Sequence, residues 1–454
     1  MTTDPREVIA KSPMSPMQIV VVGLTIALNA LDGFDILSIS FASPGISSEW
    51  KIDGARLGTV LSMELLGMAI GSVFLGGVAD RLGRRKTMLG CLVVMASGMF
   101  MATTAKGLVA LSVWRVLTGL GIGGMLAAIN AVAAEFSSTR RRDLSVSLMS
   151  IGYPLGAVFG GMIAARLLRT YDWRSVFYLG AAATTVLIPL VFFFIPESVH
   201  WLAQKQPAGA LEQINRTLAR MGHAAISALP VLSADARKRS TGDILGPALL
   251  TITMLVTIVY FLHITTFYFI LKWVPKIVVN FGFPSSSAAG VLVWVNVGGA
   301  TGGAVLGFLT QRYSVKGLTV GAMVLSSVMV MIFGQTAPEL AQLSMICAAA
   351  GFFTNGAIVG MYALFARAFP THVRASGTGF AIGLGRGGSW LAPILAGFLF
   401  DAKIGLPTVA FVMSLGSLMA AGVLMLLKLG PERRDDTPVR SDMRRGLKDA
   451  PAES

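Results

Sequence analysis

The chain has 454 residues, of which 54% are hydrophobic and only 13% are charged, and its mean hydropathy is +0.70. Soluble proteins carry roughly 25% charged residues, so the composition excludes a soluble protein and predicts an integral membrane protein. The net charge of +14 does not predict nucleic-acid binding, because the basic residues form short runs between apolar stretches, as in cytoplasmic loops. Cys91 and Cys347 lie in apolar segments and favour neither a disulfide scaffold nor a metal site.

Apolar stretches long enough to cross a bilayer as helices occur twelve times along the chain. The first has no small-residue cleavage site after it and is therefore predicted to be a retained helix and not a signal peptide. A polar interruption at 196–245 divides the stretches six and six. They lie near residues 17–42, 56–79, 87–105, 108–135, 144–168, 174–195, 246–272, 285–310, 316–335, 338–366, 375–400 and 404–428.

This pattern predicts an all-α membrane protein with an N-terminal half at 1–195 and a C-terminal half at 246–428. The segment 196–245 and the tail 429–454 are expected to be solvated cytoplasmic stretches. If both termini are cytoplasmic, the inner segments hold 26 Lys and Arg and the opposite face holds nine. The bias predicts that both termini lie on the cytoplasmic side of the inner membrane.

The two halves repeat one another in sequence. Gly76-Gly-Val-Ala-Asp80-Arg81 follows the second stretch, and Gly307-Phe-Leu-Thr-Gln311-Arg312 follows the eighth. Transporters built from two such repeats bind their substrate between the repeats, near the bilayer midplane. The repeat therefore predicts a central site between the halves.

The chain contains Gly76-x-x-x-Asp80-Arg81-x-Gly83-Arg84-Arg85, Arg115-x-x-x-Gly119-x-x-x-Gly123 and Pro196-Glu197-Ser198-x-x-Trp201-Leu202, three motifs that resemble those of the major facilitator superfamily. It also contains Asp32-Gly33-Phe34-Asp35 with Pro44 and Gly385-Arg386-Gly387-Gly388 with Pro393, which resemble motifs of the aromatic acid:proton symporter family within it. The resemblance implies the major facilitator fold and a carrier that needs no oligomer. It also implies import of a small organic anion, foremost a benzoate-type or hydroxycinnamate-type acid, by proton symport with alternating access. Gln311 departs from the acidic residue common in the second loop copy.

Charged side chains inside hydrocarbon cost about 2.5–3.5 kcal/mol or more each and are therefore candidates for function. Asp32, Asp35, Glu64 and Arg115 are predicted to carry proton coupling. At about 1.5 Å of rise per residue, the last three lie at similar depths below the outer ends of their helices and share one layer. The alternatives are a fixed hydrogen bond for each aspartate and a static ion pair between Glu64 and Arg115.

Arg386 lies near the middle of the eleventh stretch, and no acidic residue occurs in the C-terminal stretches short of their ends. A guanidinium binds a carboxylate through two parallel hydrogen bonds, so Arg386 is predicted to bind the substrate acid. Trp390, one turn on, is predicted to stack on the substrate ring. His263 and Tyr260 are further substrate-binding candidates, although an aromatic helix often serves packing. The alternative for Arg386 is a structural arginine bonded to carbonyl groups.

Asp80, Arg81, Arg84 and Arg85 follow the second stretch at the cytoplasmic mouth. The resemblance implies that this loop forms a gate between the halves. Glu135, at the end of the fourth stretch, is expected to pair with Arg84. The alternative is that the arginines only set the topology.

No phosphate-binding loop, metal-ligand cluster or hydrolase motif occurs, which predicts a protein that is not an enzyme and has no cofactor. The expected partners are a small organic acid, protons and the lipid bilayer, with a proton gradient as the energy source, since carboxylates in helices supply titratable groups. One alternative is a proton-antiport exporter of drugs or metabolites, because the glycines and proline of 152–161 loosely resemble an antiporter pattern. A more remote alternative is a membrane sensor that does not transport.

Overall fold

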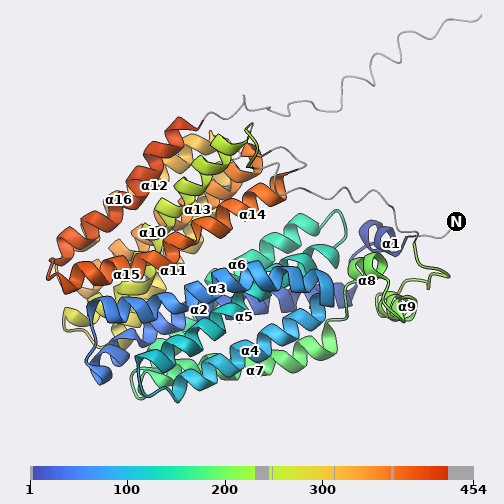
Figure 1. The fold of residues 1–454 in the computed structure, drawn as a ribbon, viewed down its shortest axis with the longest axis horizontal. Coiled ribbons are helices and arrows are strands. Elements are labelled where there is room, and N and C mark those ends of the chain that lie inside the picture. Colours follow the sequence, from blue (N-terminus) through green and yellow to red (C-terminus); the bar gives the residue numbers. More distant parts are fainter. Residues whose placement is uncertain (1–3, 231–244, 248, 311, 370–372, 428–454) are drawn as a thin grey trace, which may run out of the picture.

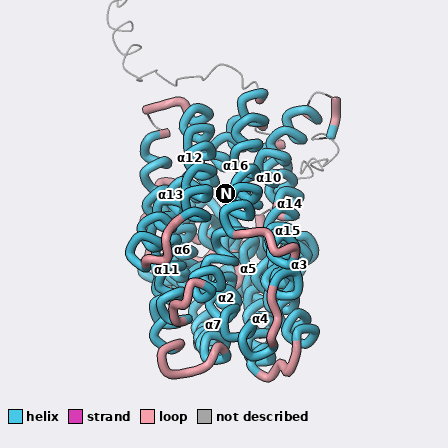
Figure 2. The backbone as a smooth tube through the Cα atoms, turned by 90° about the vertical axis from the view of Figure 1, so that its left-hand side faces the viewer, coloured by secondary structure: helices cyan, strands magenta, loops and turns pink. Residues whose placement is uncertain are grey.

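The computed structural model describes residues 4–230, 245–247, 249–310, 312–369 and 373–427. The described part folds into helices joined by short loops (Figures 1 and 2). In chain order the helices are α1 (Pro5–Lys11), α2 (Pro16–Trp50), α3 (Gly54–Leu82), α4 (Arg84–Thr103), α5 (Leu108–Glu135), α6 (Arg142–Leu167), α7 (Arg174–Phe194), α8 (Val199–Lys205), α9 (Ala210–Arg220), α10 (Leu250–Asn280), α11 (Ser285–Leu309), α12 (Val315–Gln335), α13 (Leu340–Ala368), α14 (Arg374–Gly385), α15 (Gly387–Asp401) and α16 (Leu406–Leu426).

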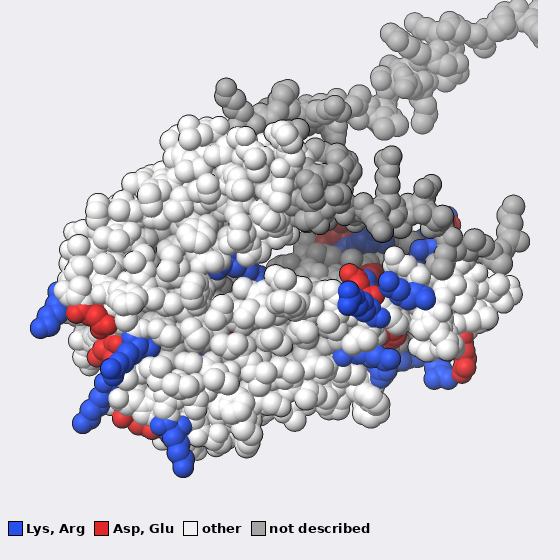
Figure 3. Space-filling model, in the orientation of Figure 1, with Lys and Arg blue, Asp and Glu red and all other residues white. Residues whose placement is uncertain are grey.

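Helices α2 to α7 form one half of the molecule and α10 to α16 form the other (Figure 1). The halves meet where α3 packs on α15, α6 on α11 and α2 on α10. One apolar core draws buried residues from both halves, whereas two further cores belong to one half each. We call the end with the shared core the closed end and the end with α1, α8 and α9 the open end. Figure 3 shows the surface hollowed between the halves toward the open end.

The twelve predicted crossings are confirmed, although only eleven described helices are individually long and apolar enough to span a bilayer. The eleventh stretch, expected as one helix over 375–400, is divided at Arg386 into α14 and α15. Glycines flank Arg386 on both sides and weaken the helix there, because glycine loses the most conformational freedom on ordering. The break sets Arg386 apart from an ordinary helical position.

Two helices are longer at the closed end than predicted. The first crossing helix, α2, continues beyond 42 to Trp50, and α10 continues beyond 272 to Asn280. Each has an internal proline, which membrane helices tolerate where neighbouring groups satisfy the freed carbonyl. Lys272 and Lys276 therefore lie inside α10, although they were counted among the nine basic residues of the face opposite the cytoplasm.

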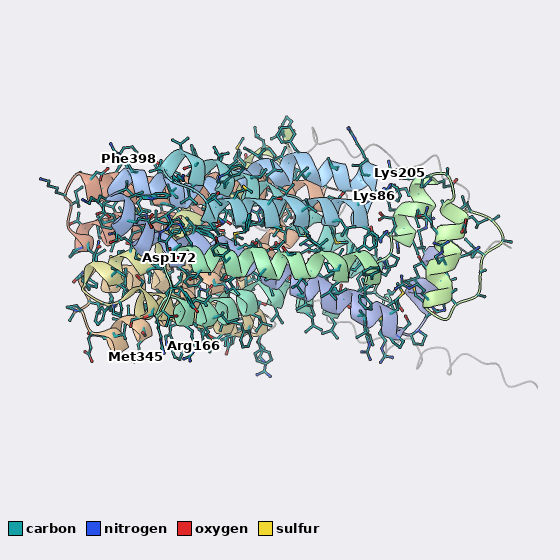
Figure 4. The ribbon with its side chains drawn as sticks, turned by 90° about the horizontal axis from the view of Figure 1, so that it is seen from below. Lys86, Arg166, Asp172, Lys205, Met345 and Phe398 are labelled. Atoms are coloured by element: carbon teal, nitrogen blue, oxygen red, sulfur yellow. The ribbon has the colours of Figure 1, made fainter. Side chains whose placement is uncertain are left out.

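Part of the loop between the halves is folded and not simply solvated. Helices α8 and α9 lie with α1 beyond the ends of α4 and α7 (Figures 1 and 4). Ala210, Ile214 and Leu218 recur along α9 at a spacing of four and are buried, which is the pattern of an amphipathic helix on a protein surface. Residues 231–244 of the same loop, the predicted tail 429–454 and Gln311 lie outside the described residues.

Candidate functional site

Asp35, Glu64 and Arg115 share one buried layer near the closed end, as their predicted depths indicated. The Arg115 guanidinium forms an ion pair with the Glu64 carboxylate, and both side chains are fully buried. It also donates to the backbone carbonyl of Asp35 at 3.1 Å and to the Met99 sulfur at 2.9 Å. The ring of Phe177 lies 5.2 Å from the guanidinium carbon. Arg115 is therefore held rigidly against Glu64.

The glycine spacing of α5 explains how Arg115 reaches Glu64. A side chain on Gly119 would collide with the backbone carbonyl of Glu64, and one on Gly123 would collide with that of Met68. Small residues let two helices approach closely inside a membrane. The Arg115-x-x-x-Gly119-x-x-x-Gly123 motif thus brings α5 against α3 and places the arginine beside the glutamate.

Asp32 and Asp35 on α2 are both buried. Neither carboxylate has a hydrogen-bond partner among the described residues, so the alternative of a fixed structural hydrogen bond has no support. Asp32 interacts electrostatically with Asp35 and Glu64, and Asp35 with Arg115 and Glu64. Together with Arg115 these three acids form a group that we call the acidic cluster.

A second cation enters this cluster from the other half. Lys272 of α10 is fully buried, its ammonium donates to the backbone carbonyl of Ile36, and it lies 3.8 Å from the Glu64 carboxylate. Lys272 was not among the predicted site residues, because the seventh helix was expected to end at 272. The signal was present in the sequence, since residues 273–280 stay largely apolar after Lys272 and extend the helix.

Arg386 occupies the break between α14 and α15 and is partly exposed. Its guanidinium has no ion pair and no hydrogen bond within the described part of the chain, so the carbonyl-bonded alternative is not observed. Four tyrosines lie close enough to interact with it electrostatically: Tyr153 on α6, Tyr260 and Tyr268 on α10, and Tyr362 on α13. Because these tyrosines come from both halves, Arg386 lies between the halves.

The other predicted substrate residues occupy different environments. Tyr260 belongs to the group around Arg386, and its hydroxyl lies 3.4 Å from that of Tyr362. His263 is fully buried: one ring nitrogen donates to the Thr354 carbonyl at 2.9 Å, and the other accepts from the Ser417 hydroxyl at 2.9 Å. Both ring nitrogens are thus used in packing α10 against α13 and α16, which favours the packing interpretation of His263.

Trp390 does not join Arg386 in the structure. The Trp390 side chain is 37% exposed and makes no ring contact with Arg386 within the described residues. The backbone N–H of Trp390 donates to the Arg386 carbonyl at 3.3 Å, so the two residues keep the predicted one-turn spacing although their side chains do not meet. The stacking role of Trp390 therefore rests on the sequence spacing alone.

The predicted gate residues form a network inside the N-terminal half. Arg84 pairs with Asp80 at 3.0 Å and with Glu135 at 3.3 Å, the second pair as the sequence indicated. Arg85 donates to the Phe192 carbonyl at 2.5 Å, whereas Arg81 is exposed and forms no ion pair with the described residues. The described contacts of this loop thus stay within one half in this conformation.

Glu197 completes this network, although the sequence analysis used it only as part of a motif. Its carboxylate accepts the backbone N–H groups of Arg84 at 2.7 Å and Arg85 at 3.2 Å, at the start of α4. A carboxylate at a helix N-terminus meets free N–H groups and the positive end of the helix dipole. Gly83 permits this contact, since its φ is +103° and a side chain there would collide with Glu197.

Comparison with known proteins identifies the family. Residues 25–348 and 256–451 match the model of the Major Facilitator Superfamily. The chain belongs to this superfamily. The superfamily fold agrees with an inward-open structure of the xylose transporter XylE from E. coli, with a TM-score of 0.68 and 18% sequence identity over 92% of this chain and 98% of that chain.

Several relatives of this chain are named as transporters of aromatic acids. The chain is 28% identical to a gallate transporter of Pseudomonas putida over 96% of this chain and 97% of the relative. It is also 28% identical to the 4-hydroxybenzoate transporter PcaK of Acinetobacter baylyi, over 87% of this chain and 88% of that one. A benzoate transport protein of the same organism is 26% identical over 88% of this chain and 87% of its own length.

Proposed function

We propose that this protein imports a small aromatic acid, of the benzoate or hydroxycinnamate type, by proton symport with alternating access. The observation that carries the proposal is Arg386, a cation between the two halves that has no anionic partner among the described residues. A buried or partly buried cation without a partner invites an anionic ligand. The relatives named for gallate, 4-hydroxybenzoate and benzoate support an aromatic carboxylate as that ligand.

The surroundings of Arg386 suit such an acid. The guanidinium can bind the carboxylate through two hydrogen bonds, while tyrosine rings offer stacking surfaces and their hydroxyls offer donors and acceptors for ring substituents. Tyr260 and Tyr362 are stacked, with ring centroids 6.2 Å apart. Tyr153 and Tyr268 interact electrostatically with both Arg386 and Glu64. These two residues thus connect the substrate site with the acidic cluster.

The acidic cluster supplies the proton carrier in this proposal. Buried carboxylates without partners are costly while ionised, and Asp32 and Asp35 have no hydrogen-bond partners within the described residues. A carboxyl group that alternately meets solution and the closed interior can pick up and release a proton. The proton gradient is the energy source, no cofactor is needed, and one chain with both halves forms the complete pathway through the bilayer.

The proposed orientation puts both termini and the open end on the cytoplasmic side of the inner membrane. Lys86 and Lys205 lie toward the open end, and Asp172 toward the closed end (Figure 4). The basic bias of the open-end loops supports this direction, and it increases when Lys272 and Lys276 are assigned to α10. The loop of Asp80, Arg81, Arg84 and Arg85 with Glu135 would then act as the cytoplasmic gate.

The glycine and proline pattern that suggested an exporter has a packing role in this structure. Side chains on Gly152, Gly156 or Gly160 of α6 would collide with Ile26, Ala30 or Phe34 of α2. The glycines of 152–161 therefore serve the packing of α6 against α2. No described feature favours export or a sensor without transport.

Counterflow in proteoliposomes tests the proposed substrate class. Vesicles loaded with unlabelled 4-hydroxybenzoate are expected to take up labelled 4-hydroxybenzoate, and gallate and benzoate are expected to compete. An inward proton gradient is expected to drive net uptake, and an uncoupler to abolish it. Exchange of only sugars or amines would refute the substrate class, whereas proton-driven extrusion would refute import.

A further inference from the structure

Lys272 makes its polar contacts with described residues in the half of the molecule to which it does not belong. It lies on α10 of the C-terminal half, while Ile36 and Glu64 lie on α2 and α3 of the N-terminal half. Both ends of the Lys272–Glu64 contact are fully buried. A buried lysine that bridges the two halves in this way must lose its contacts whenever the halves separate at that level.

Glu64 therefore lies beside two cations, one that remains next to it and one that can move away when the halves separate. Arg115 is fixed to α5 in the same half, whereas Lys272 moves with α10. Asp32 and Asp35 add two further carboxyl groups to the cluster. Among the described side chains, the other titratable groups on elements that pack against α10 are Glu49 on α2, Arg386 at the α14–α15 break, Cys347, Tyr362 and Arg367 on α13, Lys316 on α12 and Asp401 on α15, with Tyr260, His263, Tyr268 and Lys276 on α10 itself; α11 and α16 contribute none. Tyr153 on α6 also interacts electrostatically with Tyr268.

The position of Lys272 along α10 determines when it leaves. Eight residues separate it from the closed end of α10 at Asn280, which corresponds to about 12 Å along a helix. Opening the closed end parts α10 from α2 and α3 and withdraws the ammonium from Glu64. A buried carboxylate that loses its cation is penalised by several kcal/mol, and a proton bound to the cluster removes that penalty.

Building on the proposed function, we propose that the acidic cluster holds either the Lys272 ammonium or a proton. Lys272 occupies the cluster when the closed end is shut, and the proton occupies it when that end is open. The proton comes from the solution that reaches the cluster when the closed end opens, and it binds a cluster carboxylate. When the halves close again, the Lys272 ammonium returns to Glu64, and the proton leaves toward the opposite side. Tyr268, one helical turn before Lys272 and close to Arg386, lets the bound acid influence the same step.

Two measurements in proteoliposomes separate this proposal from the proposed function. Counterflow of 4-hydroxybenzoate at equal pH needs no coupling and reports on substrate transport alone. Accumulation under an inward proton gradient of one pH unit reports on coupling and should reach about tenfold for one proton per acid. We expect Lys272→Met to retain counterflow but to accumulate acid close to the equilibrium ratio of one. Lys272→Arg retains the charge and should restore accumulation.

Lys316→Met is the matched control. The Lys316 ammonium also donates to backbone carbonyls of the C-terminal half, at Met425 and Leu427, but lies away from the cluster. If methionine at 272 prevents folding, Lys272→Gln gives the same comparison, because its amide can still donate to Ile36. Parental accumulation in either neutral variant overturns the proposal, as does loss of counterflow in both. Absence of counterflow in the parent for every aromatic acid refutes the proposed function instead.

Discussion

Arg115 and Arg386 show how the same side chain serves two purposes inside one membrane protein. Arg115 has a buried carboxylate, a carbonyl, a sulfur and an aromatic ring around it. Removing one partner of such a buried pair leaves a charge without compensation and costs about 3–5 kcal/mol. Arg386 has none of these partners among the described residues and is surrounded by tyrosines. The first arginine is satisfied by the protein, and the second is available to a ligand.

Arg386→Ala is expected to weaken binding of 4-hydroxybenzoate by about 2 kcal/mol or more, or roughly thirtyfold, because the substrate carboxylate would be desolvated without a cation. Arg386→Lys should weaken it less, since the charge stays but the two-pronged geometry is lost. Equilibrium binding to the purified protein measures both effects. Arg166→Ala, which removes an exposed arginine near the closed end (Figure 4), should bind like the parent. Parental affinity in Arg386→Ala would mean that the carboxylate is held elsewhere, with Arg115 as the next candidate.

Asp32→Asn and Asp35→Asn are each expected to reduce uptake driven by a proton gradient, because an amide cannot carry a proton on and off the cluster. The amide is close to the carboxyl group in size, so folding should be preserved. Initial uptake rates at equal protein density, with and without the gradient, measure the effect. If both variants concentrate the acid as well as the parent does, proton coupling does not use these aspartates.

At the scale of elements, the start of α4 joins two motifs that are far apart in sequence. Gly83 at the end of α3, the first N–H groups of α4 and Glu197 after α7 meet at one point. Trp201 of α8 adds a hydrogen bond from its indole N–H to the Asp80 carbonyl at 3.0 Å. The two motifs therefore form one structural unit, which anchors α8 and α9 beneath the N-terminal half.

Gly83→Ala is expected to destabilise this unit by about 1–2 kcal/mol, because a side chain at positive φ is strained, and the added methyl group would also displace Glu197. Gly90→Ala is the control, since Gly90 lies within α4 and nothing approaches its added methyl group within 4 Å. After the purified protein is heated, the temperature at which half of its monodisperse peak is lost measures thermal stability. This temperature should fall only for Gly83→Ala. Equal thermal stability of the two variants would contradict the anchoring role of the α4 start.

At the scale of the whole molecule, polar contacts hold the closed end together across the two halves. Lys276 of α10 pairs with Asp53, just before α3, at 2.9 Å. The Asp401 carboxylate at the end of α15 accepts the backbone N–H of Ala55 at 2.9 Å, at the start of α3. Both contacts must break when the closed end opens. They therefore stabilise the conformation seen here relative to the one open at the other end.

Asp401→Ala is expected to shift the population toward opening of the closed end by several-fold, because a carboxylate at a helix N-terminus contributes about 0.3–2 kcal/mol. A cysteine at Val293, which lies buried against Gly161 across the halves, reports this opening through labelling by an impermeant maleimide. The native thiols of Cys91 and Cys347 are buried. Asp172→Ala, at an exposed residue of the closed end that pairs within its own half, should leave labelling unchanged. An unchanged rate in Asp401→Ala would exclude a latch at this contact.

Local sequence patterns were enough to predict the twelve crossings, their division into two halves, the shared layer of Asp35, Glu64 and Arg115, and the lack of an acidic partner for Arg386 nearby in the chain. These features depend on local quantities, namely the length of an apolar stretch, the fixed rise of a helix and the small number of charges in hydrocarbon. The four-residue spacing of apolar side chains in α9 was also present in the sequence, although that segment was expected to be solvated.

The contacts between helix faces became known only from the folded arrangement of the helices. This arrangement brought Lys272 of one half to Glu64 of the other, used both nitrogens of His263 between three helices, and placed Glu197 at the start of α4. Hydropathy could not anticipate these contacts, because a helix buried on most sides has little apolar periodicity to indicate its orientation. Glycines let neighbouring helices approach closely, and α14 and α15 are separate helices. These features then set how each helix is rotated about its axis, and the rotation decides which partners each buried charge contacts.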